Sequence, residues 1–311
     1  MRDARFELIG LGECMVELRA EQALGPAPAL TRSFGGDVLN ALVTAARLKA
    51  RTGFVTRVGA DPFGAALHAS WAEEGIDLAC TPLVKGENGV YFIALDAAGE
   101  HEFSCRRHDS SSSRIGPGDI DEAYIASASC LLVSGITQAI SSNAQAATLM
   151  ACRMARRHGV LVAYAPNYRP ALWAWRGAIE GARRAMEEIL MLVDIVLPSD
   201  PSDAALLRDK PASAGEAALQ FGRMVPEVAQ KCGAGGATVV VGENCETVPP
   251  ALARSVIDTT GAGDAWNGAY LFHRVRGDGP AVAAAAANAL VAAKLAQRGA
   301  ISARDHTNGG W

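Results

Sequence analysis

The stretch DTTGAGD at residues 258–264 decides the fold of this chain, and the run AWNGAYLF follows it at 265–272. The small residues at 261–263 allow the backbone to turn tightly and leave its N–H groups uncovered. The helix-like run predicts that these groups open a helix, where the dipole favours an anion such as phosphate. The Asp264 carboxylate would repel that phosphate unless it has a task of its own. General-base catalysis toward a hydroxyl that attacks the phosphate is such a task, and helix capping is the alternative.

A second glycine-rich segment lies near the start of the chain. It reads FGGDVLNA at residues 34–41, and VGADPFG follows at 58–64. In sequence, order and separation, these segments and the DTTGAGD stretch resemble the signatures of the ribokinase-like (PfkB) family of sugar kinases. The resemblance covers about Phe6 to about Ile301.

Short apolar runs typical of strands alternate along the chain with helix-like stretches. This alternation predicts an α/β fold with a mostly parallel central sheet and helices on both faces. The resemblance implies a ribokinase-like version of that fold with a small β-sheet lid. We expect a single domain of residues 1–311, with lid segments near 13–34 and 88–107. From the residues alone, the hairpin pattern in the second segment fits an ordinary edge hairpin equally well.

Several segments resemble the branch of the family that phosphorylates 2-keto-3-deoxygluconate. They are GECMVEL at 12–18, SGI at 134–136, NYRPALW at 167–173 and RGAI at 298–301. The resemblance implies ATP-dependent phosphorylation of the terminal hydroxyl of a sugar acid. A kinase for another sugar or nucleoside, such as fructose or ribose, and a catalytically weakened sugar-binding relative remain alternatives. A nicotinamide oxidoreductase is disfavoured, because the segment at 10–12 lacks the third glycine of a dinucleotide fingerprint.

The resemblance implies catalytic and substrate-binding roles for particular residues. Asp264 would be the general base, and the N–H groups of Gly261, Ala262 and Gly263 would stabilise the charge on the transferred phosphoryl group. The expected substrate-binding residues are Gly36, Asn40, Tyr91, Arg106, Arg107 and Arg169. Arginine suits a sugar acid because it pairs with a carboxylate through two parallel hydrogen bonds. Ala165, Ser104 and Cys105 depart from the family pattern and leave the identity of the sugar acid open.

The nucleotide and metal sites are also implied by the resemblance. The chain has no Walker-type phosphate loop. The expected nucleotide-binding residues are Ser199, Lys231, Gly233, Gly236 and Asn288, although a lone Asn in an alanine-rich helix is more often structural. Asp200 and Asp203 would hold Mg²⁺, which prefers oxygen ligands, and helix capping is their alternative. Asp258 would help to bind a monovalent cation such as K⁺, or would only satisfy a tight turn.

Composition narrows the class of protein. Half of the 311 residues are hydrophobic and the formal net charge is −4, so no basic excess indicates a nucleic-acid partner. No apolar run approaches the roughly 20 residues of a membrane span, and the N-terminus lacks a signal-peptide pattern. Seven scattered cysteines favour reduced thiols, and therefore a cytoplasmic protein. We expect a small-molecule sugar or sugar-acid substrate, no membrane partner and, from the resemblance, a homodimer or higher homo-oligomer.

Overall fold

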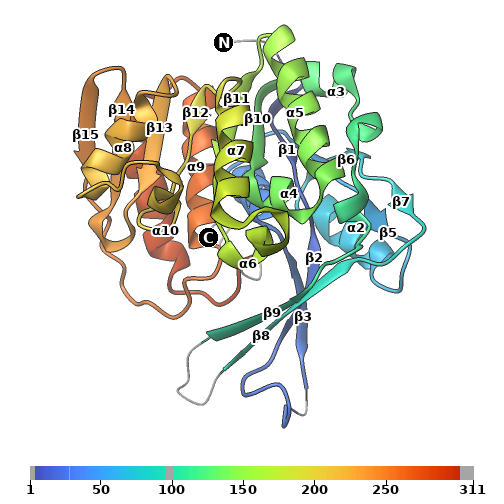
Figure 1. Ribbon diagram of the computed structural model, residues 1–311. Coiled ribbons are helices and arrows are strands. Elements are labelled where there is room, and N and C mark those ends of the chain that lie inside the picture. Colours follow the sequence, from blue (N-terminus) through green and yellow to red (C-terminus); the bar gives the residue numbers. More distant parts are fainter. Residues whose placement is uncertain (1–3, 28, 96–100, 302–311) are drawn as a thin grey trace.

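The computed structural model describes residues 4–27, 29–95 and 101–301, and a nine-stranded sheet lies at its centre (Figure 1). The strand order is β15-β14-β13-β12-β11-β10-β1-β4-β6. The strands are β1 (Phe6–Leu11), β4 (Thr52–Val55), β6 (Ile76–Cys80), β10 (Ala128–Ser134), β11 (Leu161–Ala165), β12 (Ile195–Val196), β13 (Glu227–Lys231), β14 (Ala237–Val241) and β15 (Asn244–Val248). Neighbouring strands run parallel from β13 to β6, whereas β14 pairs antiparallel with both β13 and β15. The predicted mostly parallel sheet is confirmed.

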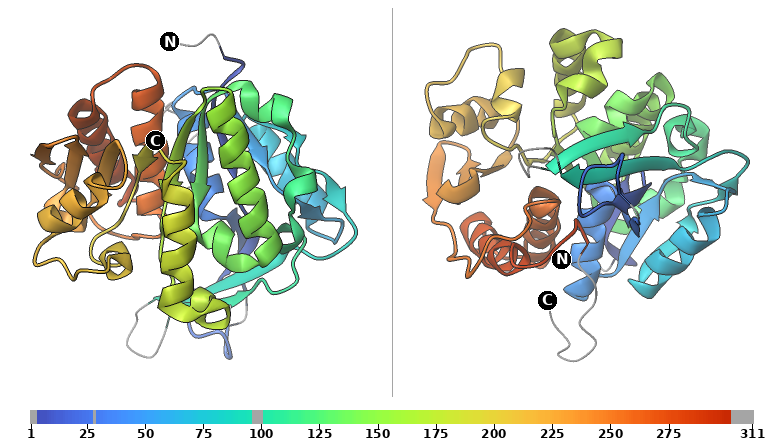
Figure 2. Two further views of the ribbon diagram at one scale, coloured as in Figure 1. Left: turned by 45° about the horizontal axis from the view of Figure 1, so that its top comes forward. Right: turned by 90° about the horizontal axis from the view of Figure 1, so that it is seen from below.

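Helices cover both faces of this sheet, as the two views of Figure 2 show. One face carries α1 (Asp37–Arg47), α2 (Gly64–Glu73), α9 (Ala262–Val275) and α10 (Pro280–Lys294). The other carries α3 (Glu122–Ala126), α4 (Gly135–Ile140), α5 (Ser142–Arg157), α6 (Pro170–Trp173), α7 (Ala178–Leu190) and α8 (Ala214–Gly222). Each face has its own hydrophobic core. Successive strand side chains point to opposite faces, so Leu8 of β1 packs on the face of α1 and α9, whereas Ile9 packs on the face of α5 and α7.

A second, four-stranded sheet projects below the main body in Figure 1. Its order is β3-β2-β8-β9, built from β2 (Met15–Arg19), β3 (Thr31–Gly35), β8 (Gly89–Leu95) and β9 (His101–Arg106). β2 pairs parallel with β8, and the two outer pairings are antiparallel. The small sheet expected from the sequence is therefore present. The turn of the hairpin pattern in the second lid segment, at 96–100, lies outside the described residues.

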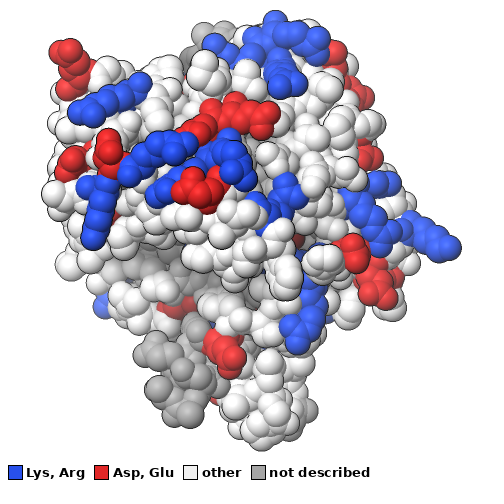
Figure 3. Space-filling view, viewed as in Figure 1, with Lys and Arg blue, Asp and Glu red and all other residues white. Residues whose placement is uncertain are grey.

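Short elements complete the fold. They are β5 (Val58–Gly59), β7 (Leu83–Val84) and the 3₁₀ turns at Ser112–Arg114, Pro117–Asp119, Ala174–Arg176, Asp203–Leu206 and Gly233–Gly235. In the described part of the face drawn in Figure 3, acidic and basic side chains lie beside one another over the helices. Among the helices that the structure describes, none is both long and apolar enough to cross a membrane.

The carboxyl ends of the parallel strands meet the N-termini of α1 and α9 at one edge of the main sheet. The N–H of Gly12, just after β1, donates to the carbonyl of Val55 at the end of β4 over 3.2 Å. A Cβ atom at Gly135, just after β10, would lie only 2.1 Å from the carbonyl oxygen of Pro166 after β11. Ligands of such sheets bind at this edge, so the candidate site is sought there.

Candidate active site

The turn that opens α9 is held in a conformation that requires glycine. Gly261 has a φ of +69°, and a Cβ atom there would lie 2.9 Å from Cα of Ala300. The Ala262 N–H closes the turn by donating to the carbonyl of Thr259 over 3.1 Å. The N–H groups of Gly261 and Gly263 donate to no described residue. Of the three N–H groups expected to face a phosphoryl group, Ala262 therefore has an internal partner, and the other two can bind an anion.

Asp264 lies in the first turn of α9 and faces the N-terminal signature. The side-chain amide of Asn40 on α1 donates to its carboxylate over 2.9 Å. Burial and the negative charge of Asp37 raise the pKa of Asp264 to about 7, against the lowering effect of the hydrogen bond from Asn40 and of the charges of Arg169 and Lys231. A carboxylate with a pKa near neutrality can accept a proton during turnover, which is what a general base requires.

Asp37 is a site residue that the sequence reasoning did not single out, although it stands within the FGGDVLN run. It opens α1, and its carboxylate accepts a hydrogen bond of 3.1 Å from the amide of Asn167. Asn167 follows β11 with a φ of +43°, a conformation that Asn tolerates better than most residues. This contact ties the loop after β11 to the start of α1. The other oxygen of Asp37 is buried and has no partner among the described residues.

The expected substrate arginines differ in their partners. Arg107 donates to the buried carboxylate of Glu13 over 2.5 Å, so its charge is largely satisfied within the protein. Arg106 is exposed and contacts Ser104 Oγ and the carbonyl of Cys105, both at 3.1 Å. Arg169 is the N-cap residue of α6 and is exposed, and its side chain has no hydrogen bond or ion pair with any described residue. Its charge nevertheless lowers the pKa of Asp264. Arg169 is therefore the arginine best placed to pair with a ligand.

Tyr91 and Gly36 lie where the small sheet meets α1. The buried hydroxyl of Tyr91 donates to Glu17 of β2, a residue that the sequence reasoning quoted but gave no role. A Cβ atom at Gly35 would lie 2.3 Å from that hydroxyl and 3.6 Å from Oδ1 of Asn40. One at Gly36 would lie 2.2 Å from the carbonyl of Glu13. The backbone at these two glycines therefore passes close to its neighbours, as the motif predicts.

Lys231, at the end of β13, lies beside the turn of α9. A Cβ atom at Gly263 would be 3.7 Å from its Cε. The ammonium donates to the carbonyl of Leu197 over 2.7 Å and to Oδ1 of Asn267 over 2.8 Å. Burial lowers the pKa of Lys231 to about 8, although the nearby charges of Asp203 and Asp264 favour the protonated form. This cation lies next to the free N–H groups, where a phosphate would bring negative charge.

Several expected nucleotide and metal residues are engaged in internal contacts. The Asp203 carboxylate is fully buried and accepts N–H bonds of 2.7 Å from both Tyr168 and Ser199. Each oxygen accepts one of these bonds, so Asp203 fastens the loops after β11 and β12. Its expected contact with Mg²⁺ stays a prediction. Asp200 is half-buried, and its N–H donates to the carbonyl of Lys231 over 2.9 Å. Within the described residues, no group of three or more His, Cys, Asp or Glu could hold a metal.

Asn288 has a structural position in α10. Its Oδ1 accepts from Nε1 of Trp266 over 2.8 Å, and its amide donates to the carbonyl of Pro249 over 2.7 Å. These contacts fasten the segment after β15 to the helix pair. The expected position of Asn288 near a nucleotide stays a prediction. Gly233 and Gly236 both have positive φ in the β13–β14 connection, and a Cβ atom at Gly236 would lie 2.3 Å from the carbonyl of Val248.

Asp258, the expected cation ligand, is engaged as well. Its two oxygens accept N–H bonds of 2.8 Å from Thr260 and Gly299, and Arg19 lies 3.0 Å away. Burial opposes ionisation, but hydrogen bonds from the side chain of Thr260 and from the backbone of Gly299 and Thr260, together with the Arg19 charge, hold the pKa of Asp258 well below its usual range. Lys294, which the sequence reasoning did not notice, donates to carbonyls of the same two segments.

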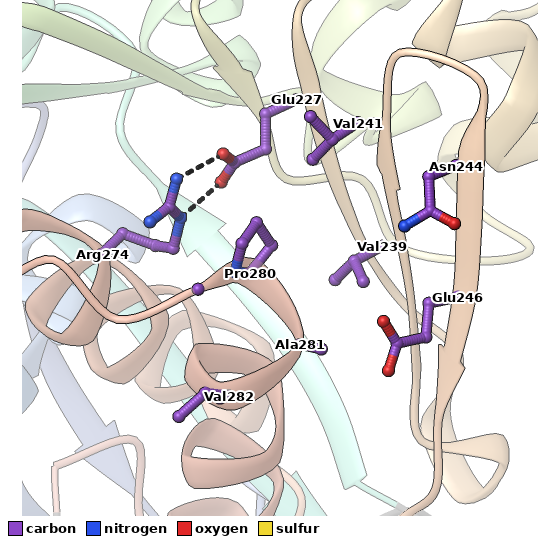
Figure 4. A pocket seen from close by; sticks show the side chains of 10 residues that line it. Glu227, Val239, Val241, Asn244, Glu246, Arg274, Pro280, Ala281 and Val282 are labelled. Atoms are coloured by element: carbon purple, nitrogen blue, oxygen red, sulfur yellow. Dashed lines mark hydrogen bonds and ion pairs between the residues drawn. The ribbon is translucent and has the colours of Figure 1, made fainter.

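A pocket of about 350 Å³ lies at the other end of α9 (Figure 4). The side chains of Glu227 and Arg274 form an ion pair of 2.6 Å at its edge. Arg274 is ten residues after Asp264 on the same helix, or roughly 15 Å along its axis. The pocket is therefore separate from the cluster around Asp264.

Comparison with known proteins places this arrangement in a family. The model of the pfkB family of carbohydrate kinases matches residues 6–307, and the chain belongs to that family. It resembles the 2-dehydro-3-deoxygluconokinase of Dickeya dadantii (strain 3937), with 33% identity over 94% of this chain and 95% of the relative. The expected family and carbohydrate kinase activity are confirmed.

Solved structures show the same fold. The PfkB protein from Polaromonas sp. JS666 superposes with a TM-score of 0.83 at 27% identity, over 93% of this chain and 95% of that one. A ribokinase II homologue from E. coli, solved with ATP and Mg²⁺, superposes with a TM-score of 0.84 at 23% identity, over 95% and 94%. The ribokinase-like fold expected from the sequence is confirmed.

Proposed function

We propose that this protein phosphorylates the terminal hydroxyl of 2-keto-3-deoxygluconate, also called 2-dehydro-3-deoxygluconate, with ATP as phosphoryl donor. The observation that carries the proposal is the Asp264 carboxylate, which has a pKa near 7 and lies in the turn that presents two free N–H groups. The substrate is taken from the similarity to the Dickeya dadantii kinase over nearly the whole chain.

Different residues carry out the proton transfer and the charge stabilisation in the proposed phosphoryl transfer. Asp264 takes the proton from the sugar hydroxyl as that oxygen forms a bond to the γ-phosphorus, and the bond from phosphorus to the leaving ADP oxygen breaks. The N–H groups of Gly261 and Gly263 and the Lys231 ammonium stabilise the negative charge of the transferred group. Mg²⁺ bound to the triphosphate neutralises charge on the nucleotide. Asp200, whose side chain has no partner among the described residues, would contact the hydrated ion more readily than Asp203, whose two oxygens each accept an N–H bond.

The sugar acid is recognised chiefly by Arg169. Its guanidinium is free of described partners and close enough to Asp264 to lower that pKa. Arg107 contributes less directly, because Glu13 already neutralises it. Asn40, Gly36 and Tyr91 line the proposed sugar site where the small sheet meets α1.

A substrate panel tests this proposal. ADP release is measured with 2-keto-3-deoxygluconate, fructose and ribose, and we expect the acid to give the highest kcat/KM. Arg169→Ala should cost on the order of 2–5 kcal/mol in kcat/KM for the acid, because a site built for a charge loses one partner of the pair. Arg153→Ala, on the exposed face of α5, is the matched control and should change nothing. A wild type that prefers fructose or ribose would replace the sugar-acid proposal with the neutral-sugar one. Binding of the acid without ADP release would point to a weakened relative.

We also propose that residues 1–311 form one domain in which the four-stranded sheet acts as a lid over the sugar. We propose further that this sheet pairs two copies of the enzyme, and that the enzyme is cytoplasmic. Phe103 of β9 is 53% exposed there, which supports a partner on that sheet. The free cysteines among the described residues suit a reducing compartment. Light scattering of the wild type and of Phe103→Ser tests the pairing. A monomeric wild type would contradict it.

A further inference from the structure

Lys294, the last residue of α10, is completely buried. A lysine is almost never fully buried unless its charge is paired. Its ammonium donates to the carbonyl of Thr260 over 2.6 Å and to the carbonyl of Gly299 over 3.0 Å. Both acceptors are backbone oxygens, one just before the turn of α9 and one in the last described loop. The lysine therefore joins two segments that are far apart in the chain.

Asp258 joins the same two segments through their N–H groups. It accepts from Thr260 and Gly299, while Lys294 donates to the carbonyls of these two residues. The negative charge of Asp258 favours the protonated lysine and offsets part of the burial that disfavours it. The Asp258 carboxylate thus accepts from the N–H groups of Thr260 and Gly299, and the Lys294 ammonium donates to the carbonyl groups of the same two residues.

The cluster of Asp258 and Lys294 around the backbone of Thr260 and Gly299 is adjacent to the turn that opens α9. Thr260 precedes Gly261, and Ala300 packs against Gly261 so closely that a Cβ atom there would clash. A shift of Thr260 or of the last loop would therefore move the Gly261 and Gly263 N–H groups. A displacement of about 1 Å at such a site costs on the order of a hundredfold in rate.

The same carbonyls are the groups that an alkali cation would use, since such a cation needs convergent oxygen ligands beside a carboxylate. Here the ammonium takes that position. A second monovalent cation in contact with these oxygens would lie a few ångströms from the buried ammonium, and like charges repel strongly at that distance away from water. The residues of this chain therefore do not fit the expected K⁺ ion at Asp258.

We propose that the Lys294 ammonium is a built-in monovalent cation, which holds the Thr260 and Gly299 carbonyls in place and makes the enzyme independent of K⁺. Lys294 is a positioning residue, since it acts through the turn that presents the N–H groups. The inference rests on the proposed kinase reaction only for its kinetic measurements. Its thermal and crystallographic measurements do not depend on any activity.

The wild type provides the first test. Activity and melting temperature are measured in KCl, NaCl and choline chloride at equal ionic strength. We expect kcat and melting temperature to be the same in the three salts. A severalfold rise in kcat or a clear rise in melting temperature with K⁺ would overturn the proposal, whatever the variants do.

Two variants of Lys294 provide the second test. Lys294→Ala leaves room for an ion, whereas Lys294→Met fills that room with an apolar chain and leaves the carbonyls unpaired. We expect both to lose about ten- to hundredfold in kcat in choline chloride, the usual worth of losing charged hydrogen bonds. K⁺ or NH₄⁺ should restore activity and melting temperature in Lys294→Ala but not in Lys294→Met. Lys210→Met, at an exposed position, is the control and should behave as the wild type.

A heavy-atom soak locates the ion directly. Crystals of Lys294→Ala soaked in Tl⁺, which mimics K⁺ and scatters anomalously, should show a peak between the carbonyls of Thr260 and Gly299, and wild-type crystals should show none there. Equal behaviour of the two variants, or a Tl⁺ peak in the wild type, would show that the lysine does not stand in for an ion. If neither variant folds, the salt response and the soak of the wild type decide the question. A wild type that does not phosphorylate the sugar acid, but whose melting temperature is the same in the three salts, would contradict the proposed substrate and not this inference.

Discussion

Asn40 donates a hydrogen bond of 2.9 Å to Asp264, although the two residues are 224 positions apart in the chain. Asn40 lies on α1 and Asp264 opens α9, so this contact joins the two glycine-rich signatures at one point. The N–H of Gly36 donates to Oδ1 of the same Asn40 side chain over 3.4 Å, which leaves the Asn40 amide to face the carboxylate. The proposed base is thereby oriented by the segment expected to bind the sugar.

Replacing Asp264 by Asn should keep the shape of the site and remove proton acceptance. We expect kcat to fall by roughly 10²–10⁴, the usual worth of general-base catalysis, with little change in ATP affinity. Steady-state kinetics and calorimetric titration with ATP measure the two quantities. Asp278→Asn, just past the other end of α9, is the control and should leave kcat unchanged. Turnover close to that of the wild type would show that Asp264 is not the base.

The acid limb of the pH–rate profile should report Asp264. Because its pKa is about 7, log kcat should rise with pH up to about 7 and then level off. Asp37 raises that pKa, so Asp37→Asn should move the limb to lower pH. The exposed Asp209→Asn should leave it in place. A limb that stays fixed or moves upward in Asp37→Asn would contradict the electrostatic coupling of the two carboxylates.

The stability of the wild type should also depend on this carboxylate. Its folded-state pKa of about 7 lies above the value of about 4 in an unfolded chain, so the folded state binds more protons between these values. Stability from this group is therefore fully present below pH 4 and is lost as the pH rises to about 7. Asp264→Asn lacks the charge, so its melting temperature relative to wild type should increase from pH 5 to pH 8. A constant or decreasing difference would mean that the carboxylate is not buried against its neighbours.

The two glycines of the turn should respond differently to alanine. Gly261→Ala forces a positive φ and a contact of about 3 Å with Ala300, so it should lower both the melting temperature and kcat. Gly263→Ala meets only the Lys231 side chain, at 3.7 Å from Cε and 3.9 Å from Cδ, which are ordinary contacts, and it replaces glycine within a helix. It should leave the melting temperature unchanged or raise it, since alanine is favoured there by about 0.5–1 kcal/mol. Thermal melts and kinetics of both variants check this. Equal losses in the two variants would contradict the special requirement for glycine at position 261.

The fold and the reacting end of the site could be predicted from the sequence because both depend on local patterns. The turn of Gly261 requires small residues wherever it occurs, and a carboxylate at Asp264 has few reasons to stand beside a phosphate site. Alternating strands and helices likewise determine a parallel sheet, since each strand must bury side chains on both faces. These signals lie within a few consecutive residues and need no knowledge of distant contacts.

Only the tertiary structure decided which polar groups are free and which are already paired. The sequence predicts ligand contacts for Asp203 and Asn288, and the structure adds internal partners, which are the N–H groups of Tyr168 and Ser199 for Asp203 and the indole of Trp266 for Asn288. Lys294 looked like an ordinary residue of an alanine-rich helix, yet its ammonium reaches backbone carbonyls at Thr260 and Gly299. A buried polar group must find a partner, and folding alone brings that partner from elsewhere in the chain.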